Sequence, residues 1–498
     1  MMPVGEHPER WQATALQVQR SGVRRLGSGV RRLGSGVRRL AGALDALRCC
    51  QAKASRAVAS HRTPDRRTPD RRAPDRVTAL SGEATALQMN FSVATMDPAR
   101  PEPVRAPYRV AMVTTHPIQY QVPWLRKLAS RADVDLQVYF AMMPDQAEQG
   151  REFGVSFAWD LPLLDGYRYT VLENRSKRPS LTAFSGCDTP QINSEIRHGA
   201  FDAVIVNGWV AKTCVQALWA CMMSGTPCIV RGEVNGLRPR ASWKRAAHRA
   251  LLSRYAAALC IGTRNREYCL ARGVSPSQIF STPYCVDNQR FADSANDWMR
   301  RCSREELRTR FNLKQNGVTF LFSGKFVDKK RPGDLILALR RAVADGTQNA
   351  QVLMVGAGPL EPVLKEMARD LPVSFAGFLN QSEIAAAYAA SDCLVLPSDS
   401  GETWGLVVNE AMACGLPAFV SDQVGCAADL VRPGETGAVF PCGDAAALGR
   451  LISDLSSRPA DLRSQGERAR SLVFEQYNFE RVVEGVVAAV TQVARGRA

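Results

Sequence analysis

The sequence of 498 residues contains no uninterrupted apolar run of about 18 residues, the length that a membrane-spanning helix requires. Its N-terminus is rich in arginine and has no continuous apolar segment, so we expect no secretory signal. The fourteen cysteines are scattered, and none form a C-x-x-C pair or a cysteine–histidine cluster with zinc spacing. These absences predict a reduced, cytoplasmic protein without a structural metal, and its length predicts two or three domains.

The positive charge is concentrated near the N-terminus. Of the formal net charge of +16, residues 1–105 contribute +10, from 19 Lys and Arg against 9 Asp and Glu. Short arginine-rich repeats at 21–41 and 62–76 cannot bury a core, which favours disorder. We interpret residues 1–105 either as a basic arm that contacts nucleic acid or anionic lipid, or as a non-native extension that precedes a true start at Met89 or Met96.

From Tyr108 onward, short β-branched runs alternate with helical segments, a pattern typical of parallel sheets with crossover helices. Strands are predicted in the first half at 108–115, 136–140, 202–207, 227–231 and 258–262, and in the second half at 318–324, 351–356, 373–377, 393–398, 417–422 and 437–440. Helices are predicted at 118–130, 212–224, 241–255, 303–311, 331–345, 359–370, 381–390, 405–414, 444–456, 460–473 and 479–494. The segment STPYCVDNQRF (281–291) is predicted to cross between the halves.

The fold class is therefore predicted as α/β, with two Rossmann-like parallel-sheet domains that face each other across a cleft. We place the domains at 106–290 and 291–475, followed by a C-terminal helix at 476–498 that packs back on the first domain. Ligands of such sheets bind beyond the carboxyl ends of the strands, so the cleft is the natural site.

A basic turn follows the first strand of the second half, in SGKFVDKKRP (323–332). Gly324 permits a tight turn, and Lys325, Lys329, Lys330 and Arg331 follow it. Lysines at the carboxyl end of a strand suit a phosphate group, although a solvated basic turn is the alternative.

A glycine-rich turn follows the next strand, in VGAGPL (355–360), with Gly356 and Gly358 between a strand and a helix. The third glycine of the dinucleotide motif G-x-G-x-x-G is missing, because Glu361 stands in its place. The turn fits a nucleotide nearby better than it fits NAD.

Two glutamates bracket the start of a predicted apolar helix that begins at Gly405 and ends before Gly415. The unpaired N–H groups of its first turn attract an anion. Glu402 precedes the helix and Glu410 lies inside it, where an unsatisfied carboxylate costs several kcal/mol. A carboxylate can accept two hydrogen bonds from a vicinal diol, and an ion pair with a buried Arg or Lys is the structural alternative.

These motifs resemble the nucleotide-sugar domain of retaining GT-B glycosyltransferases of the family 4 type. The resemblance rests on SGKFVDKKRP, VGAGP, VSFAGF, ASDCLVLPS and GETWGLVVNEAMACGLP, in this order within residues 318–422, and on VRPGETGAVF at 431–440. It implies net retention at the anomeric carbon and no required metal.

The resemblance also implies roles for single residues. Lys325 and Lys330 would bind the diphosphate, Glu410 the nucleotide ribose and Glu402 the transferred sugar. The remaining donor-binding residues that it indicates are Gly324, Gly356, Gly358, Gly377, Phe378, Ser398, Thr403, Trp404, Gly405, Leu406 and Val407, with Gly377 and Phe378 against the base.

The first half departs from the family pattern. The loop THPIQYQVP (115–123) replaces a glycine-rich loop, and VIVNGW has Asn207 where many members have a histidine. His116 is our catalytic candidate on this side, with a turn or cap residue as the alternative. Arg231, Glu233 and Asn207 are acceptor-side candidates, and a mutual Arg231–Glu233 ion pair is the alternative for the first two.

The expected function is transfer of a sugar, with retention, from a nucleotide-diphosphate sugar to a glycan or lipid-linked hydroxyl acceptor. Cell-surface polysaccharide, lipopolysaccharide or glycolipid biosynthesis is the expected setting, with no cofactor beyond the donor substrate. We expect a peripheral contact with the inner face of the membrane and no nucleic-acid partner. The alternatives are an NAD-type oxidoreductase and a non-catalytic carbohydrate-binding protein on the same fold.

Overall fold

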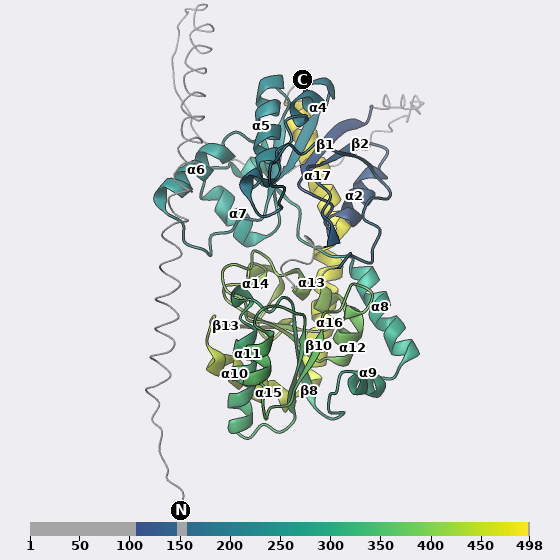
Figure 1. The fold of residues 1–498 in the computed structure, drawn as a ribbon, viewed down its shortest axis with the longest axis vertical. Coiled ribbons are helices and arrows are strands. Elements are labelled where there is room, and N and C mark those ends of the chain that lie inside the picture. Colours follow the sequence, from purple (N-terminus) through teal and green to yellow (C-terminus); the bar gives the residue numbers. More distant parts are fainter. Residues whose placement is uncertain (1–105, 147–156, 497–498) are drawn as a thin grey trace, which may run out of the picture. The chain divides into compact units, whose positions relative to one another are not determined.

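The computed structural model describes residues 106–146 and 157–496 (Figure 1). The interpretation of residues 1–105 falls outside these residues. Within the described part of the chain, no helix combines the length and the apolarity needed to cross a bilayer.

The first half forms a sheet of seven parallel strands in the order β3-β2-β1-β4-β5-β6-β7. The strands are β1 (Tyr108–Thr114), β2 (Val134–Phe140), β3 (Arg168–Val171), β4 (Ala203–Asn207), β5 (Cys228–Gly232), β6 (Ala257–Cys260) and β7 (Ile279–Ser281). The helices of this half are α2 (Val122–Ala129), α4 (Ile192–His198), α5 (Lys212–Ser224), α6 (Ser242–Leu252) and α7 (Thr263–Leu270).

The second half forms a sheet of six parallel strands in the order β10-β9-β8-β11-β12-β13. The strands are β8 (Val318–Ser323), β9 (Ala350–Val355), β10 (Val373–Gly377), β11 (Cys393–Leu396), β12 (Ala418–Ser421) and β13 (Gly437–Phe440). The helices are α8 (Asn288–Arg301), α9 (Arg304–Arg310), α10 (Pro332–Ala344), α11 (Glu361–Met367), α12 (Ile384–Ala390), α13 (Leu406–Ala413), α14 (Ala427–Leu430), α15 (Ala445–Ser456) and α16 (Pro459–Gln476). The predicted pair of parallel α/β sheets is confirmed.

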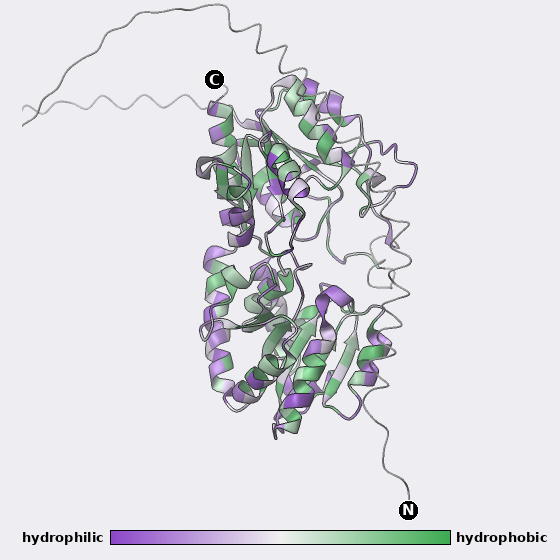
Figure 2. Ribbon diagram, turned by 90° about the vertical axis from the view of Figure 1, so that its left-hand side faces the viewer, coloured by the Kyte–Doolittle hydropathy of each residue, from purple (hydrophilic) through white to green (hydrophobic). Residues whose placement is uncertain are grey.

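The central strands of both sheets are buried on both faces, because helices cover each side. In β1, Val110 and Met112 belong to one apolar cluster, whereas Ala111 and Val113 belong to the cluster on the opposite face. This alternation explains why the strands read as continuous apolar runs. Figure 2 shows the same arrangement, with apolar strands inside and helices that carry polar residues on one side.

The crossover between the halves is shorter than the predicted segment 281–291. Strand β7 ends at Ser281, and α8 already begins at Asn288, where the Asp287 side chain caps it by accepting a hydrogen bond from the N–H of Arg290. Helix α8 was not predicted from the sequence because only a narrow face of it, with Phe291 and Ala292, is buried. The elements β3, β7, α4, α7 and α14 were not predicted either, since they are short and have weak patterns.

The last helix, α17 (Phe479–Arg495), packs on the first sheet although it follows the second in sequence. Its residues Val482, Val486 and Val490 share an apolar cluster with strands β1, β2, β4 and β6. The preceding helix α16 instead packs against α13 and α15 of the second half. The chain therefore crosses between the halves a second time, at the junction of α16 and α17.

A buried charge cluster lies at the N-terminal ends of the central strands β8 and β11 of the second sheet. The Asp392 carboxylate accepts hydrogen bonds from the N–H of Thr319 and from the guanidinium groups of Arg304 and Arg308, at 2.6 to 2.8 Å. The Arg308 side chain is 8% exposed and that of Asp392 is 14% exposed. Removing one partner of such a pair leaves an uncompensated buried charge.

We expect Asp392→Ala to destabilise the protein by about 3 kcal/mol, because it leaves Arg308 buried without its anion. The measurement is the midpoint of urea or thermal unfolding. Asp454→Ala, on α15, which breaks an exposed pair with Arg458, is the matched control and should change the midpoint little. Equal midpoints for the two variants would contradict the role of Asp392.

Candidate functional site

A cavity of about 380 Å³ lies at the carboxyl ends of the strands and is lined by residues from both halves. Those from the second half are Ser323, Gly324, Lys325, Lys329, Lys330, Val355, Gly356, Phe378, Leu379, Gln381, Ile384, Glu402, Thr403, Trp404, Gly405, Leu406, Val407 and Glu410. Those from the first half are Gln119, Tyr120, Trp159, Glu233 and Tyr284.

Two glycine turns form one wall of the cavity by packing directly on each other. A Cβ atom on Gly356 would overlap the carbonyl oxygen of Gly324, and both residues have positive φ. The close approach brings the β8 turn with Lys325 next to the β9 turn. Gly358 lies behind this wall, against the backbone of Phe326, and does not line the cavity.

Helix α13 points its N-terminus into the cavity. Its first turn begins after Gly405, which has a φ of +100° and therefore disfavours a side chain. A Cβ atom at this position would also lie only 2.7 Å from the side chain of Leu396. The backbone N–H groups of Leu406 and Val407, which line the cavity, have no partner within the helix. This end of the helix therefore carries a partial positive charge that suits an anion.

Glu402 and Lys330 form an ion pair beside the N-terminus of α13, and both side chains are 14% exposed. The Ser398 hydroxyl lies 3.4 Å from the same oxygen of Glu402, beneath the cavity rather than in its wall. Lys325 and Lys329 also line the cavity. The structure thus gathers three lysines, one glutamate and a helix N-terminus at one point.

Glu410 projects from α13 and is held by a hydroxyl group rather than by a cation. Tyr388 on α12 donates a hydrogen bond to Oε2 at 2.7 Å, while Oε1 has no hydrogen-bond partner among the described residues. Burial raises the pKa of the Glu410 carboxyl, and the hydrogen bond from Tyr388 opposes that shift. Within the described ranges no ion pair includes Glu410, so the structural alternative from the sequence is wrong.

The turn after β10 forms another part of the wall. The carbonyl oxygen of Gly377 accepts a hydrogen bond from the N–H of Gly356 at 2.8 Å, which ties this turn to the β9 turn. Phe378 lines the cavity, and its ring centroid lies 4.6 Å from that of Phe157. Gly377 itself does not line the cavity.

The first half contributes a third carboxylate to the cavity, Glu233, which follows β5. Tyr284 donates a hydrogen bond to its Oε1, and the hydroxyl of Tyr120 lies 3.5 Å from the same atom. Burial raises the pKa of the Glu233 carboxyl, Arg231 and Tyr120 lower it, and the nearby Glu402 adds to the rise. Glu233 and Glu402 therefore face the same cavity from opposite halves.

The alternative drawn from the sequence was an ion pair between Arg231 and Glu233. Arg231 does not form this pair. The arginine is 2% exposed, and its guanidinium lies between two rings, 5.5 Å from the centroid of Trp124 and 4.8 Å from that of Tyr284. Its Nε and Nη1 atoms have no hydrogen-bond partner in the described part of the chain. Arg231 therefore supports the Tyr284 ring from behind the cavity.

The structure places two first-half candidates away from the cavity. His116 contacts the Thr115 hydroxyl at 2.9 Å, and burial lowers its pKa to about 4. Asn207 donates hydrogen bonds to Thr114 and Gln121 and holds the β1–α2 loop. The cavity is lined instead by Gln119 and Tyr120, because the loop turns after Pro117, where the carbonyl of residue 118 accepts the N–H of residue 121.

Tyr120 and Tyr284 on this side were not predicted from the sequence. Tyr284 follows β7 in the crossover, and its carbonyl oxygen accepts a hydrogen bond from Asn409 of α13 at 3.1 Å. Asn409 in turn accepts a hydrogen bond from the indole of Trp404. The sequence signal that could have indicated Tyr284 is the PYCV segment, which follows the last strand of the first half. Aromatic residues at the ends of strands border the cleft.

Residues 303–472 match the family model described as glycosyl transferases group 1. Among similar proteins, N-acetyl-alpha-D-glucosaminyl L-malate synthase of Bacillus anthracis is 29% identical over 182 residues, 36% of this chain and 46% of that protein. D-inositol 3-phosphate glycosyltransferase of Geodermatophilus obscurus is 31% identical over 234 residues, 45% of this chain and 49% of that protein. The chain thus spans about half the length of each of these two relatives.

Solved structures resemble the protein over most of its described length. The glycosyltransferase from Rickettsia africae has a TM-score of 0.60 at 15% identity and covers 78% of this chain and 99% of its own. Anabaena HepE, in complex with UDP and glucose, has a TM-score of 0.54 at 13% identity, and the match covers 77% of this chain and 99% of HepE. Sucrose-phosphate synthase from Thermosynechococcus elongatus has a TM-score of 0.58 at 20% identity, and the match covers 78% of this chain and 100% of the synthase.

These likenesses establish the fold, while the sequence match shows that residues 303–472 are similar to one family. The expected resemblance is confirmed by both. The chain has the GT-B fold, and its residues 303–472 match the glycosyl transferases group 1 family.

Proposed function

We propose that the protein transfers a sugar from a nucleotide-diphosphate sugar to a hydroxyl acceptor, with retention at the anomeric carbon. The observation that carries the proposal is the arrangement in one cavity of lysines, the N-terminus of α13 and the carboxylates of Glu402 and Glu410. A diphosphate matches the cationic part of this arrangement, and sugar hydroxyls match the carboxylates. The structural relative HepE, which has been solved with UDP and with UDP-glucose, supports the same class of donor.

The positive groups would stabilise the charge that develops on the leaving diphosphate. Lys325 and Lys330 line the cavity beside the first-turn amides of α13, which supply fixed dipoles. This charge is available from the chain itself, so the proposal requires no metal. The acceptor oxygen attacks from the face that the diphosphate leaves, and the departing phosphate takes the acceptor proton, so no protein nucleophile is needed.

The donor would lie along α13. The free Oε1 of Glu410, together with Oε2, would accept hydrogen bonds from the two ribose hydroxyls. Glu402, before the helix, would accept from the hydroxyls of the transferred sugar after exchanging its bond with Lys330. The turn that carries Phe378 borders the place left for the base.

The acceptor would enter from the side of the first half. Glu233 is a carboxylate in the cavity whose oxygen already accepts from Tyr284, and an acceptor hydroxyl can donate to it in the same way. Its role would be to orient the acceptor oxygen toward the anomeric carbon. His116, which does not line the cavity, has no part in this scheme.

The alternatives fit the site less well. A dinucleotide would need the β9 turn open to its pyrophosphate, but Gly358 is packed against Phe326. A non-catalytic carbohydrate-binding protein would have no use for the lysines beside the helix N-terminus. The cavity retains every charged group that the transfer scheme uses.

A thermal-shift screen with UDP-, GDP-, ADP- and TDP-sugars tests the proposal and identifies the base, because a bound ligand raises the apparent stability. With the donor known, NMR of the product of transfer gives the anomeric configuration. We expect the sugar nucleotides of one base to raise the unfolding midpoint of the protein. We expect the product to retain the anomeric configuration of the donor. An inverted product, or a shift with NADH but with none of the sugar nucleotides, would overturn the proposal.

We expect Glu410→Gln to weaken binding of the nucleotide by about 10- to 100-fold, the equivalent of a lost charge-assisted hydrogen bond. The variant should fold normally. Since the pKa of Glu410 is raised, ionisation costs stability as the pH rises through that pKa, so at pH 7 the amide should unfold at the same temperature or higher. Calorimetric titration and thermal unfolding measure the two effects.

Glu366→Gln, on the exposed face of α11, is the control for the loss of one carboxylate and should bind like the wild type. The assignment of Glu410 fails if its variant binds nucleotide with unchanged affinity. A large fall in unfolding temperature would show a structural role instead.

We expect Glu233→Gln to raise the KM for the acceptor by about tenfold or more while donor binding stays the same, because only the acceptor loses a charge-assisted hydrogen bond. The raised pKa of Glu233 implies that the wild-type enzyme loses transfer as the pH falls, beginning above the range of an ordinary glutamate. In the variant this acid limb should move to lower pH. The pH profile of kcat/KM for the acceptor measures it.

Glu195→Gln is a matched control in the same half, since Glu195 also accepts a hydrogen bond from a tyrosine, Tyr139, but lies outside the cavity. It should leave both KM values unchanged. If the Glu233 variant kept the wild-type profile and acceptor KM, Glu233 would have no role in acceptor binding.

A further inference from the structure

The positive charge of the described body is concentrated in one segment, residues 236–272. Residues 106–498 contain 45 Lys and Arg and 39 Asp and Glu, a net charge of +6. The segment holds nine of these basic residues and a single acid, Glu267, so it carries +8 and the remainder of the body carries −2. The segment covers α6, β6 and α7 together with the connections between them.

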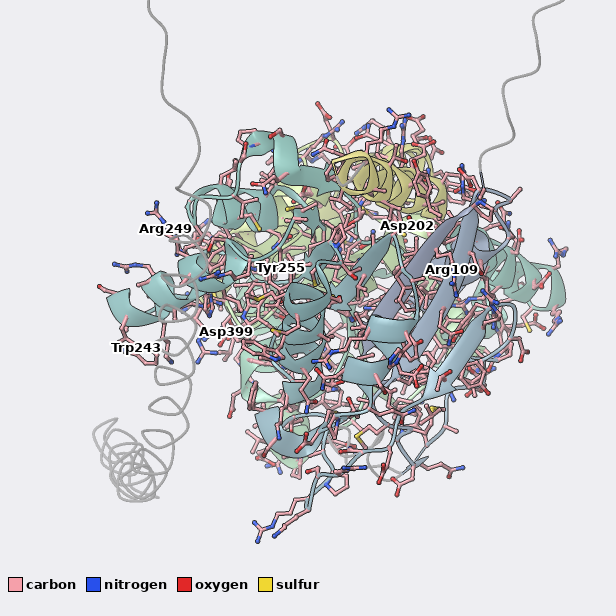
Figure 3. All side chains as sticks on the ribbon, turned by 90° about the horizontal axis from the view of Figure 1, so that it is seen from above. Arg109, Asp202, Trp243, Arg249, Tyr255 and Asp399 are labelled. Carbon is pink, nitrogen blue, oxygen red and sulfur yellow. The ribbon has the colours of Figure 1, made fainter. Side chains whose placement is uncertain are left out.

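Helix α6 presents much of this charge to solvent. Residues 242–246 and Arg249 are all exposed, and Leu252 is the one fully buried residue of the helix. Trp243 is 54% exposed, with the Lys244 ammonium 5.3 Å from its ring centroid. Figure 3 shows Trp243 and Arg249 at the outer edge, directed away from the body.

We define the α6 face as Arg238, Trp243, Lys244, Arg245 and Arg249. None of its four basic side chains is paired with an acid within the described residues; the segment's one ion pair joins Arg264 to Glu267. Unpaired basic side chains around an exposed tryptophan indicate a surface that binds a large anionic partner rather than one that is satisfied internally.

The α6 face adjoins the acceptor side of the cavity. The connection that carries Glu233 out of β5 continues directly into α6. On the neighbouring strand end, the Trp209 ring packs against His248 of α6 at 5.4 Å between centroids. Val210, which follows Trp209 in the chain, is an apolar residue that is 73% exposed.

We propose that the α6 face docks on an anionic bilayer, and that the acceptor is therefore a molecule carried by the membrane. The second part rests on the proposed function, whereas the docking does not. Tryptophan and the stems of Lys and Arg favour the interface of a bilayer, and the charged heads attract anionic headgroups. A protruding helix with exposed alanines suits a planar surface.

Other occupants fit the face less well. A second copy of the chain would bring two faces of the same charge together. Residues 1–105, with a net charge of +10, have the same sign as well. Single-stranded nucleic acid is bound by a groove with several stacking aromatic residues, whereas the α6 face has one tryptophan on a protruding helix.

The test is co-sedimentation of the full chain with vesicles of phosphatidylcholine and phosphatidylglycerol, compared with vesicles of phosphatidylcholine alone. We expect the wild type to bind the anionic vesicles, and the triple variant Lys244→Glu, Arg245→Glu and Arg249→Glu to bind roughly 100-fold less tightly. Trp243→Ala should weaken binding several-fold, and high salt should weaken the wild type.

The matched control is Arg450→Glu, Arg463→Glu and Arg470→Glu, three exposed residues of α15 and α16 that change the net charge equally. The control should bind as the wild type does. Docking through α6 is overturned if the control and the α6 variant lose equal affinity, if the α6 variant binds normally, or if a DNA oligonucleotide binds the wild type more tightly than anionic vesicles do.

Nucleotide binding in the thermal-shift assay separates this proposal from the proposed function. The α6 variant should keep the wild-type shift, because none of its altered residues lines the cavity. If the protein docks on anionic vesicles but binds no nucleotide, the proposed function fails and the docking proposal stands. With nucleotide binding intact, transfer to a membrane-embedded acceptor should fall in the α6 variant, and undiminished transfer there would overturn the inference about the acceptor.

Discussion

The candidate site depends on how closely three backbone turns approach one another at the carboxyl edge of the second sheet. The turn after β9 fits against the turn after β8 because Gly356 has no Cβ atom, which would overlap the carbonyl oxygen of Gly324. Gly405 starts α13 in a conformation that a side chain would strain. Three chain segments that are distant in sequence thereby place lysines, backbone amides and two glutamates within one cavity.

This packing leaves two carboxylates in an environment that disfavours their charge. Glu410 and Glu233 both have raised pKa values because of burial, and both are held by tyrosine hydroxyls rather than by direct ion pairs. A fold selected for stability alone would place apolar or paired residues at such positions. Carboxylates with raised pKa values at the wall of a cavity mark a candidate functional site, which accords with the hydroxyl-binding roles proposed for them.

The two sides of the cavity are joined by a short relay of hydrogen bonds. The indole of Trp404 donates to Asn409, and Asn409 donates to the carbonyl of Tyr284, whose hydroxyl holds Glu233. The helix that would bind the donor thus positions the tyrosine on the acceptor side. The same acceptor side continues into the basic helix α6, so the proposed membrane contact and the proposed chemistry lie on one continuous stretch of chain.

The sequence by itself determined the alternation of strands and helices, the two halves, and the residues proposed for the donor side, because strand periodicity, glycine turns and the Glu402–Glu410 spacing are local in the chain. It predicted Lys330 and Glu410 but not their partners. It also predicted that the C-terminal helix packs back on the first domain. Only the tertiary structure decided that His116 does not line the cavity and that Tyr120 and Tyr284 do. The positions of Tyr120 and Tyr284 depend on contacts with Glu233 and Asn409, respectively, more than a hundred residues away in the chain, which no local pattern of residues records.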